Sequence, residues 1–164
     1  PYLLFALADN GQAEAAYKML LNTKCPSWLY EVKVGATTVW ERWDGLDENG
    51  ECPIGDDGTD KMISYNHFAF GAVGDFLYRR VAGLEPLEAG YRRFAVRPLV
   101  GGGLTRAGAW VEPPYGRAAA EWEIKGDTFT LTVTVPVGTT CKVTMPDGTC
   151  KICPSGTHTC ACKR

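Results

Sequence analysis

The sequence lacks a strong excess of charge of either sign. Its 164 residues carry 17 basic and 19 acidic side chains, which leaves a net charge of -2. A field this weak does not recruit nucleic acid or an anionic membrane surface. Its apolar runs are also shorter than the roughly 20 residues that a membrane-spanning helix needs. We therefore expect no nucleic-acid or membrane partner, and partners that are neutral or small.

An initiator methionine and a signal peptide are both absent. The chain begins PYLLFALADNG, with an apolar helix face already under way. A signal peptide instead runs from a basic segment through an apolar one to small residues. We therefore expect a piece of a longer protein, and the missing signal gives no information about that protein's location.

An even number of cysteines, usual in a disulfide framework, is missing as well. Five of the seven cysteines lie at or after residue 141. CKIC at 150–153 followed by CAC at 160–162 has the spacing of a four-thiolate zinc site, and these thiols also permit disulfides. The alternation of polar and apolar residues over 157–162 instead indicates a strand with one buried face. We prefer packing of free cysteines in a core, with zinc and disulfides as open alternatives.

The first half of the chain shows the apolar spacing of helices. Residues 2–9 and 12–22 predict two helices separated by Asn10-Gly11, a pair that suits a left-handed helix end. A short helix is expected over 27–34, because proline suits the position where a helix begins. The acidic stretch 44–60 predicts a solvated loop, with a calcium site as the open alternative.

The stretch NHFAFGAVGDFLYRRVAG, residues 66–83, predicts one continuous helix. Four apolar residues form its stripe: Phe70, Val73, Leu77 and Val81. Glycine costs about 1 kcal/mol relative to alanine inside a helix. Gly71 and Gly74 therefore predict the close approach of another backbone or of a ligand.

After residue 83 the apolar spacing changes from helical to alternating. Short alternating segments separated by turn residues predict an antiparallel β-sandwich, with turns at 138–140 and 146–148. The expected strands cover residues 94–97, 107–111, 118–124, 129–135, 141–145, 149–153 and 158–162.

The stretch TTVWERWDG, residues 37–45, holds a carboxylate and a guanidinium between two tryptophans. Its β-branched start predicts an extended backbone, in which Glu41 and Trp43 share one face while Trp40 and Arg42 share the other. This alternation places an aromatic ring beside the carboxylate. The open alternative is a surface pair of Glu41 with Arg42, with both tryptophans in packing.

Five stretches, in order along nearly the whole chain, resemble the C-terminal portion of bacterial α-L-rhamnosidases of glycoside hydrolase family 78. They are PYLLFALADNG, PSWLYEVKVGATTVWERWDG, SYNHFAFGAVGDFLYRRVAGL, GYRRFAVRPLVGGGLTRAGAWVEPPYGRAAAEWEI and FTLTVTVPVGTT. The resemblance implies that residues 1–82 are the last helices of an (α/α)6 catalytic barrel and that residues 83–164 form a C-terminal β-sandwich. It implies an inverting glycosidase that releases terminal α-L-rhamnose, using one carboxylic acid and one carboxylate base. We expect no cofactor and no metal.

The resemblance also implies site residues. The family's Thr-Thr-x-Trp-Glu-Arg-Trp-Asp pattern places its general base at Glu41, and its Asn-His pattern places sugar contacts at Asn66 and His67. Trp43 is a further expected sugar contact, and three residues are additional candidates: Trp40, Arg42 and Tyr30. The family's general acid has no counterpart here, so the isolated chain is expected to be inactive. The expected partners are rhamnose-containing glycosides and the remainder of the barrel.

A second function stays open, that of a carbohydrate-binding or structural β-sandwich module without catalysis. Its platform would be Trp110, Tyr115 or Trp122. A platform needs an exposed ring, whereas Trp122 alternates with Ala120 and Ile124 as a core residue does. Another glycosidase with an (α/α)6 barrel is the third interpretation.

Overall fold

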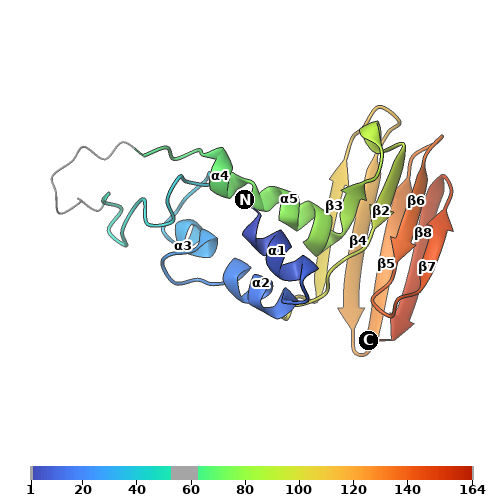
Figure 1. The fold of residues 1–164 in the computed structure, drawn as a ribbon, viewed down its shortest axis with the longest axis horizontal. Helices are drawn as coiled ribbons and strands as arrows, with labels where there is room; N and C mark the ends of the chain where they lie inside the picture. The colour runs from blue at the N-terminus through green and yellow to red at the C-terminus, as the bar shows by residue number, and fades with distance from the viewer. Residues whose placement is uncertain (1, 53–62, 164) are drawn as a thin grey trace. The chain divides into compact units, whose positions relative to one another are not determined.

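The computed structural model describes residues 2–52 and 63–163, which form helices first and strands afterwards (Figure 1). The chain divides into two compact units, a helical unit of residues 1–74 and a sandwich unit of residues 75–164. Residues 53–60 of the acidic stretch 44–60, for which a loop or a calcium site was predicted, lie outside the described residues. No helix within them is both long and apolar enough to cross a bilayer.

The three helices predicted over 2–9, 12–22 and 27–34 are present. Asn10 follows the first, and Gly11 adopts the left-handed φ of 77° that the sequence predicted. The third begins at Ser27, whose hydroxyl oxygen accepts a hydrogen bond from the amide of Tyr30 at 3.0 Å. The helices are α1 (Leu3–Asp9), α2 (Ala13–Leu20), α3 (Trp28–Lys33) and α4 (Phe68–Gly71).

The single helix predicted over 66–83 is instead broken into α4, α5 (Val73–Phe76) and the π-helix η1 (Leu77–Ala82). A π-turn holds an extra residue, so it rotates the following side chains away from the expected face. Phe76 is buried while Leu77, the first residue of η1, is 41% exposed, so the predicted stripe is wrong at Leu77. A Cβ added at Gly71 or Gly74 would meet no described atom within 4 Å, so no described backbone makes the predicted close approach.

The sandwich unit contains two four-stranded sheets, ordered β1-β2-β6-β7 and β3-β4-β5-β8. All pairs are antiparallel except β2 with β6, which is parallel. The seven predicted strands are confirmed, and the short β1 was missed. The strands are β1 (Leu84–Pro86), β2 (Arg93–Val96), β3 (Arg106–Val111), β4 (Ala118–Lys125), β5 (Thr128–Val135), β6 (Thr140–Thr144), β7 (Cys150–Cys153) and β8 (Gly156–Lys163).

One apolar core lies between the two sheets. Trp122 is 3% exposed there, as its alternation predicted, and its indole Nε1 donates a hydrogen bond to the carbonyl of Val81 at 2.8 Å. Cys141 and Cys153 are register partners on β6 and β7, and both are fully buried. Burial raises the pKa of Cys141 to about 12, so its thiol stays protonated at neutral pH. These two cysteines therefore pack as small hydrophobes.

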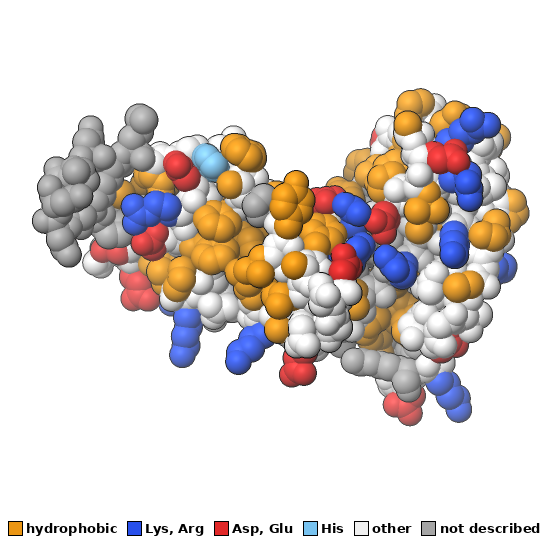
Figure 2. Space-filling model, viewed as in Figure 1, with side chains coloured by type: hydrophobic (Ala, Val, Ile, Leu, Met, Phe, Trp, Pro, Cys, Tyr) orange, Lys and Arg blue, Asp and Glu red, His pale blue; other side chains and the backbone are white. Residues whose placement is uncertain are grey.

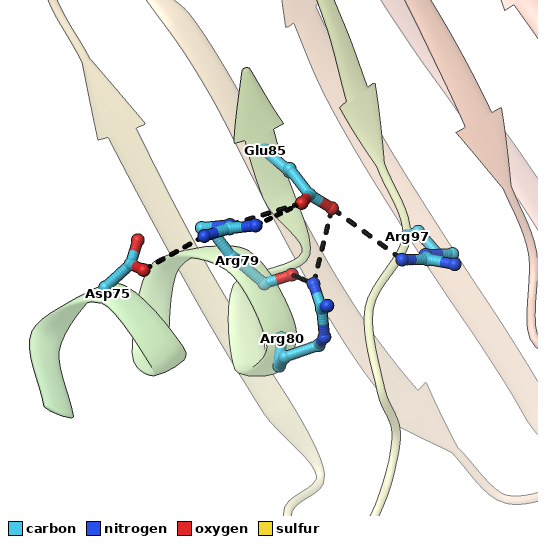
Figure 3. A network of polar contacts seen from close by, with 5 residues as sticks. All are labelled: Asp75, Arg79, Arg80, Glu85 and Arg97. Atoms are coloured by element: carbon cyan, nitrogen blue, oxygen red, sulfur yellow. Dashed lines mark hydrogen bonds and ion pairs between the residues drawn. The ribbon is translucent and has the colours of Figure 1, made fainter. Parts of the chain in front are cut away.

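A cluster of charges joins η1 to the first sheet (Figure 3). Glu85 on β1 accepts a hydrogen bond from Arg79 at 2.6 Å and one from Arg80 at 3.3 Å, and Arg97 lies 3.7 Å away. Arg79 also pairs with Asp75 at 3.1 Å. Arg80 is 8% exposed, so Glu85 neutralises a charge that water barely reaches.

We expect Glu85→Ala to lower the free energy of unfolding of the sandwich unit by about 2 to 4 kcal/mol, because it leaves the buried Arg80 guanidinium without this counter-charge. Urea unfolding of the 164-residue chain measures the change. The matched control is Glu88→Ala, which removes an exposed partner of Arg93 and is expected to cost about 1 kcal/mol or less. Equal effects of the two substitutions would contradict this account.

Candidate active site

The two segments that the sequence nominated lie side by side. The amide of His67 donates to the carbonyl of Val39 at 2.8 Å, and the amide of Glu41 donates to the carbonyl of Ser64 at 2.8 Å. These two backbone bonds join segments more than twenty residues apart. They place the expected base and the expected sugar-contacting histidine on neighbouring segments of the chain.

The Glu41 carboxylate is held by a backbone amide of the neighbouring segment, and the side chain stays exposed. Its Oε2 accepts a hydrogen bond from the amide of Ser64 at 2.9 Å, and the residue is exposed. This backbone donor fixes the direction of the carboxylate. The other oxygen has no hydrogen-bond partner among the described residues, so a water molecule has access to it. An oriented carboxylate that meets water is suited to general-base chemistry.

The segment around Glu41 is not the extended strand that the sequence predicted. Its backbone bends, and a turn closes with the amide of Gly45 donating to the carbonyl of Arg42 at 3.1 Å. The Arg42 guanidinium makes two bonds of 3.0 Å to the carboxylate of Asp44. The alternative pair of Glu41 with Arg42 is therefore wrong, because Arg42 closes the turn with Asp44 instead. The packing of Trp40 and Trp43, which the same alternative predicted, is present.

Trp43 is fixed by other aromatic rings. It stacks on Phe70 with centroids 4.4 Å apart and meets the edge of Trp28 at 4.8 Å. The three rings line a small apolar cavity of about 80 Å³. The indole Nε1 of Trp43 is buried and has no acceptor among the described residues. Because a buried donor rarely stays without an acceptor, this nitrogen is suited to a partner from outside them.

His67 begins α4 and is half-buried. Its Nδ1 accepts a hydrogen bond from the amide of Ala69 at 3.2 Å, and its ring stacks on Phe68 with centroids 4.9 Å apart. An accepting Nδ1 places the ring hydrogen on Nε2, so Nε2 is the atom that can donate to a ligand. Asn66 precedes it and is exposed, and its backbone amide donates to the Ser64 hydroxyl at 3.3 Å.

Helix α3 supports both ends of the loop that carries Glu41. The Oε2 of Glu31 accepts from the amide of Trp40 at 3.1 Å, and the hydroxyl of Tyr30 donates to the carbonyl of Leu46 at 3.1 Å. The side chains of Tyr30 and Trp40, two candidate site residues, are 5% and 3% exposed. In the helical unit they therefore fix the loop from inside.

Sequence reasoning missed Glu31, although a carboxylate within the apolar helix WLYEV was a usable signal. The residue is 2% exposed, and its Oε1 has no hydrogen-bond partner among the described residues. Burial raises the pKa of this carboxyl, and the bond from Trp40 lowers it by less.

Two family models match the chain. Residues 1–81 match the bacterial alpha-L-rhamnosidase 6 hairpin glycosidase domain, and residues 83–158 match the bacterial alpha-L-rhamnosidase C-terminal domain. An alpha-L-rhamnosidase of Formosa agariphila is 41% identical over 147 residues, which cover 89% of this chain and 15% of that protein. The chain thus spans less than a fifth of the curated relatives that it matches.

Solved structures show the same likeness. The alpha-L-rhamnosidase of Aspergillus terreus matches with a TM-score of 0.89 and 37% identity, over 99% of this chain and 19% of its own. The Streptomyces avermitilis alpha-L-rhamnosidase, solved in complex with L-rhamnose, matches with a TM-score of 0.85 and 35% identity, over 98% of this chain and 17% of its own.

We expect Glu31→Gln to remove the pH dependence of the stability of the loop that carries Glu41. Burial raises the pKa of Glu31 in the folded chain above its unfolded value of about 4.3. The contribution of Glu31 to the stability of the loop is therefore complete below the unfolded pKa and is lost as pH rises through the folded pKa. Glutamine keeps an acceptor for the amide of Trp40 and never ionises. Hydrogen exchange of that amide should match wild type near pH 4 and be slower than wild type near pH 7.

Glu31→Ala is the matched control, because it removes the acceptor at every pH and should speed exchange at both. Parallel pH profiles for the wild-type chain and Glu31→Gln would contradict the burial argument.

Proposed function

Because the chain belongs to the bacterial alpha-L-rhamnosidase family, we propose that it works as part of a longer inverting glycosidase that releases terminal α-L-rhamnose from glycosides. In this proposal the chain supplies the general base, Glu41. The observation that carries it is the exposed carboxylate of Glu41, oriented by the amide of Ser64 next to the segment of His67.

An inverting hydrolysis needs two carboxyl groups on opposite faces of the sugar, about 6.5 to 9.5 Å apart. The acid protonates the departing oxygen, while the base takes a proton from the attacking water. The second oxygen of Glu41 receives that proton, with the first held by Ser64. Because one carboxylate cannot fill both roles, the acid comes from the remainder of the catalytic barrel.

The other site residues divide into two roles. His67 donates from Nε2 to a sugar hydroxyl, and Asn66, which is exposed, offers its side-chain amide to another hydroxyl. Trp43, held by Phe70 and Trp28, offers apolar ring surface to the sugar. The remaining candidates act on the loop rather than on the sugar, with Trp40 and Tyr30 buried beneath it and Arg42 closing its turn.

The helical unit leaves apolar side chains for the rest of a barrel to cover. Hydrophobic side chains gather over the surface of the helices (Figure 2). Tyr2, Leu3 and Phe68 are 79%, 55% and 81% exposed. Contact with further helices would remove this surface from water, at about 25 cal/mol for each Å². The partner proposed for this surface is therefore the remainder of the barrel.

In the full-length protein that carries this chain, we expect Glu41→Gln to lower kcat on an aryl α-L-rhamnoside by about 10² to 10⁴-fold. KM should change little, because glutamine keeps the shape of the side chain and its bond from Ser64. Steady-state kinetics test this. Glu48→Gln, an exposed carboxylate beyond the same turn, is the matched control and should leave kcat unchanged. Turnover at the wild-type rate in Glu41→Gln would remove this residue from the mechanism.

The 164-residue chain alone is expected to give no turnover of the same substrate, because it supplies only the base. Release of the aryl alcohol is followed at high protein concentration. Turnover that disappears in Glu41→Gln would show that the chain also holds the acid and would overturn the division of roles.

A further inference from the structure

The sandwich unit has a groove of about 610 Å³ on the outer face of its second sheet. Register fixes which side chains share that face, because neighbours across strands point the same way. Arg106 lies opposite Glu123, and Gly108 lies opposite Glu121. Trp122, which lies between the two glutamates on β4, points into the core, because it is buried while both glutamates are exposed.

Gly108 lies in the groove lining between Arg106 and Trp110, the two large neighbours on the same face of β3. A Cβ at this position would lie 2.9 Å from the Cγ of Glu121 and 3.1 Å from the carbonyl oxygen of Ala120. The glycine therefore leaves no spare room of its own, because the Glu121 side chain takes the space that a Cβ would need. The stem of Glu121 lies against the glycine, which brings its carboxylate to the groove.

Trp110 is the aromatic wall of the groove. Its side chain is half in solvent, with an exposed fraction of 52%. The guanidinium of Arg117 lies 4.3 Å from the ring centroid, and Glu112 holds that guanidinium with a bond of 2.7 Å. The ring is thus a plate steadied from one face by an anchored cation. A steadied, exposed indole loses little freedom when a ligand stacks on it.

The groove lining holds one cation, Arg106, and two carboxylates, Glu121 and Glu123, and Lys125 beside the groove supplies the second cation. Arg106 faces two carboxylates, and Lys125 neutralises one of them with a bond of 2.8 Å to Glu123. The hydroxyls of Thr130 and Thr132 line the groove beyond β4. Balanced charges give no attraction for a polyanion. The lining also offers too little apolar area for a hydrophobic peptide.

We propose that this groove binds a neutral saccharide. A sugar ring has one apolar face for Trp110 and hydroxyls that donate to Glu121 and accept from Arg106 and the threonines. The site is separate from the one that contains Glu41, and it does not depend on the proposed glycosidase activity.

Titration of the 164-residue chain with L-rhamnose, with D-galactose and with D-glucuronate tests the site. The readout is the NMR shift of the Trp110 indole N–H and of the amides of β3, β4 and β5. At least one neutral sugar should shift them in a saturable way, and the anionic glucuronate should bind more weakly. Trp110→Ala should weaken binding about tenfold or more, and Glu121→Gln should weaken it severalfold.

Two controls keep the result specific. Tyr115→Ala removes an aromatic ring that is 44% exposed and lies outside the groove, so it should leave binding unchanged. Glu41→Gln should also leave it unchanged, which separates this groove from the proposed base. Trp110 and Glu121 are exposed, so unchanged core amide shifts will show that their variants fold.

Three results would overturn the proposal. They are no shift at Trp110 with any of these sugars, equal binding by Trp110→Ala and wild type, and shifts confined to the segments around Glu41 and His67.

Discussion

The pairing of the Glu41 segment with the Ser64 segment is the constraint on which the candidate site depends. Two backbone bonds of 2.8 Å join the segments, one of them to the carbonyl of Ser64, and the amide of Ser64 directs the Glu41 carboxylate. Neither segment belongs to a regular strand, so no sheet holds the pairing in place. Support comes instead from α3, whose Glu31 and Tyr30 side chains bind the two ends of the loop. A base placed on a loop is precise only when such a second layer fixes it.

That second layer has features of an incomplete interior. Glu31 and Trp43 each have a buried polar atom without a partner among the described residues. Buried polar groups in finished proteins are almost always hydrogen-bonded. Phe68, beside His67, is 81% exposed, which is rare for a large apolar side chain in a complete core. Both observations agree with relatives that are more than five times as long as this chain, of which it spans 15% or less.

Local sequence predicted most of the fold because alternation and helix-end residues act over short distances. The strand over 128–135 alternates Phe129, Leu131 and Val133 inward, and the turns follow their glycines. Prediction failed where tertiary contacts decide. A π-turn cannot be read from apolar spacing, which still fits one continuous helix over 66–83. The bend at Glu41 is set by distant Ser64, so the nominated residues were identified from resemblance while their geometry was not.

The five tryptophans show why residue type alone does not assign a role. Trp40 and Trp122 are 3% exposed, and each gives its surroundings an anchor, one under the Glu41 loop and one in the sandwich core. Trp43 stacks on Phe70 and Trp28 meets the same ring edge-on, and the three rings line a cavity of about 80 Å³. Trp110 differs because its strand position turns it outward, where it lines a groove on the surface of the sheet. Alternation, which decides between core and surface, is thus also what separates a structural indole from one that can meet a ligand.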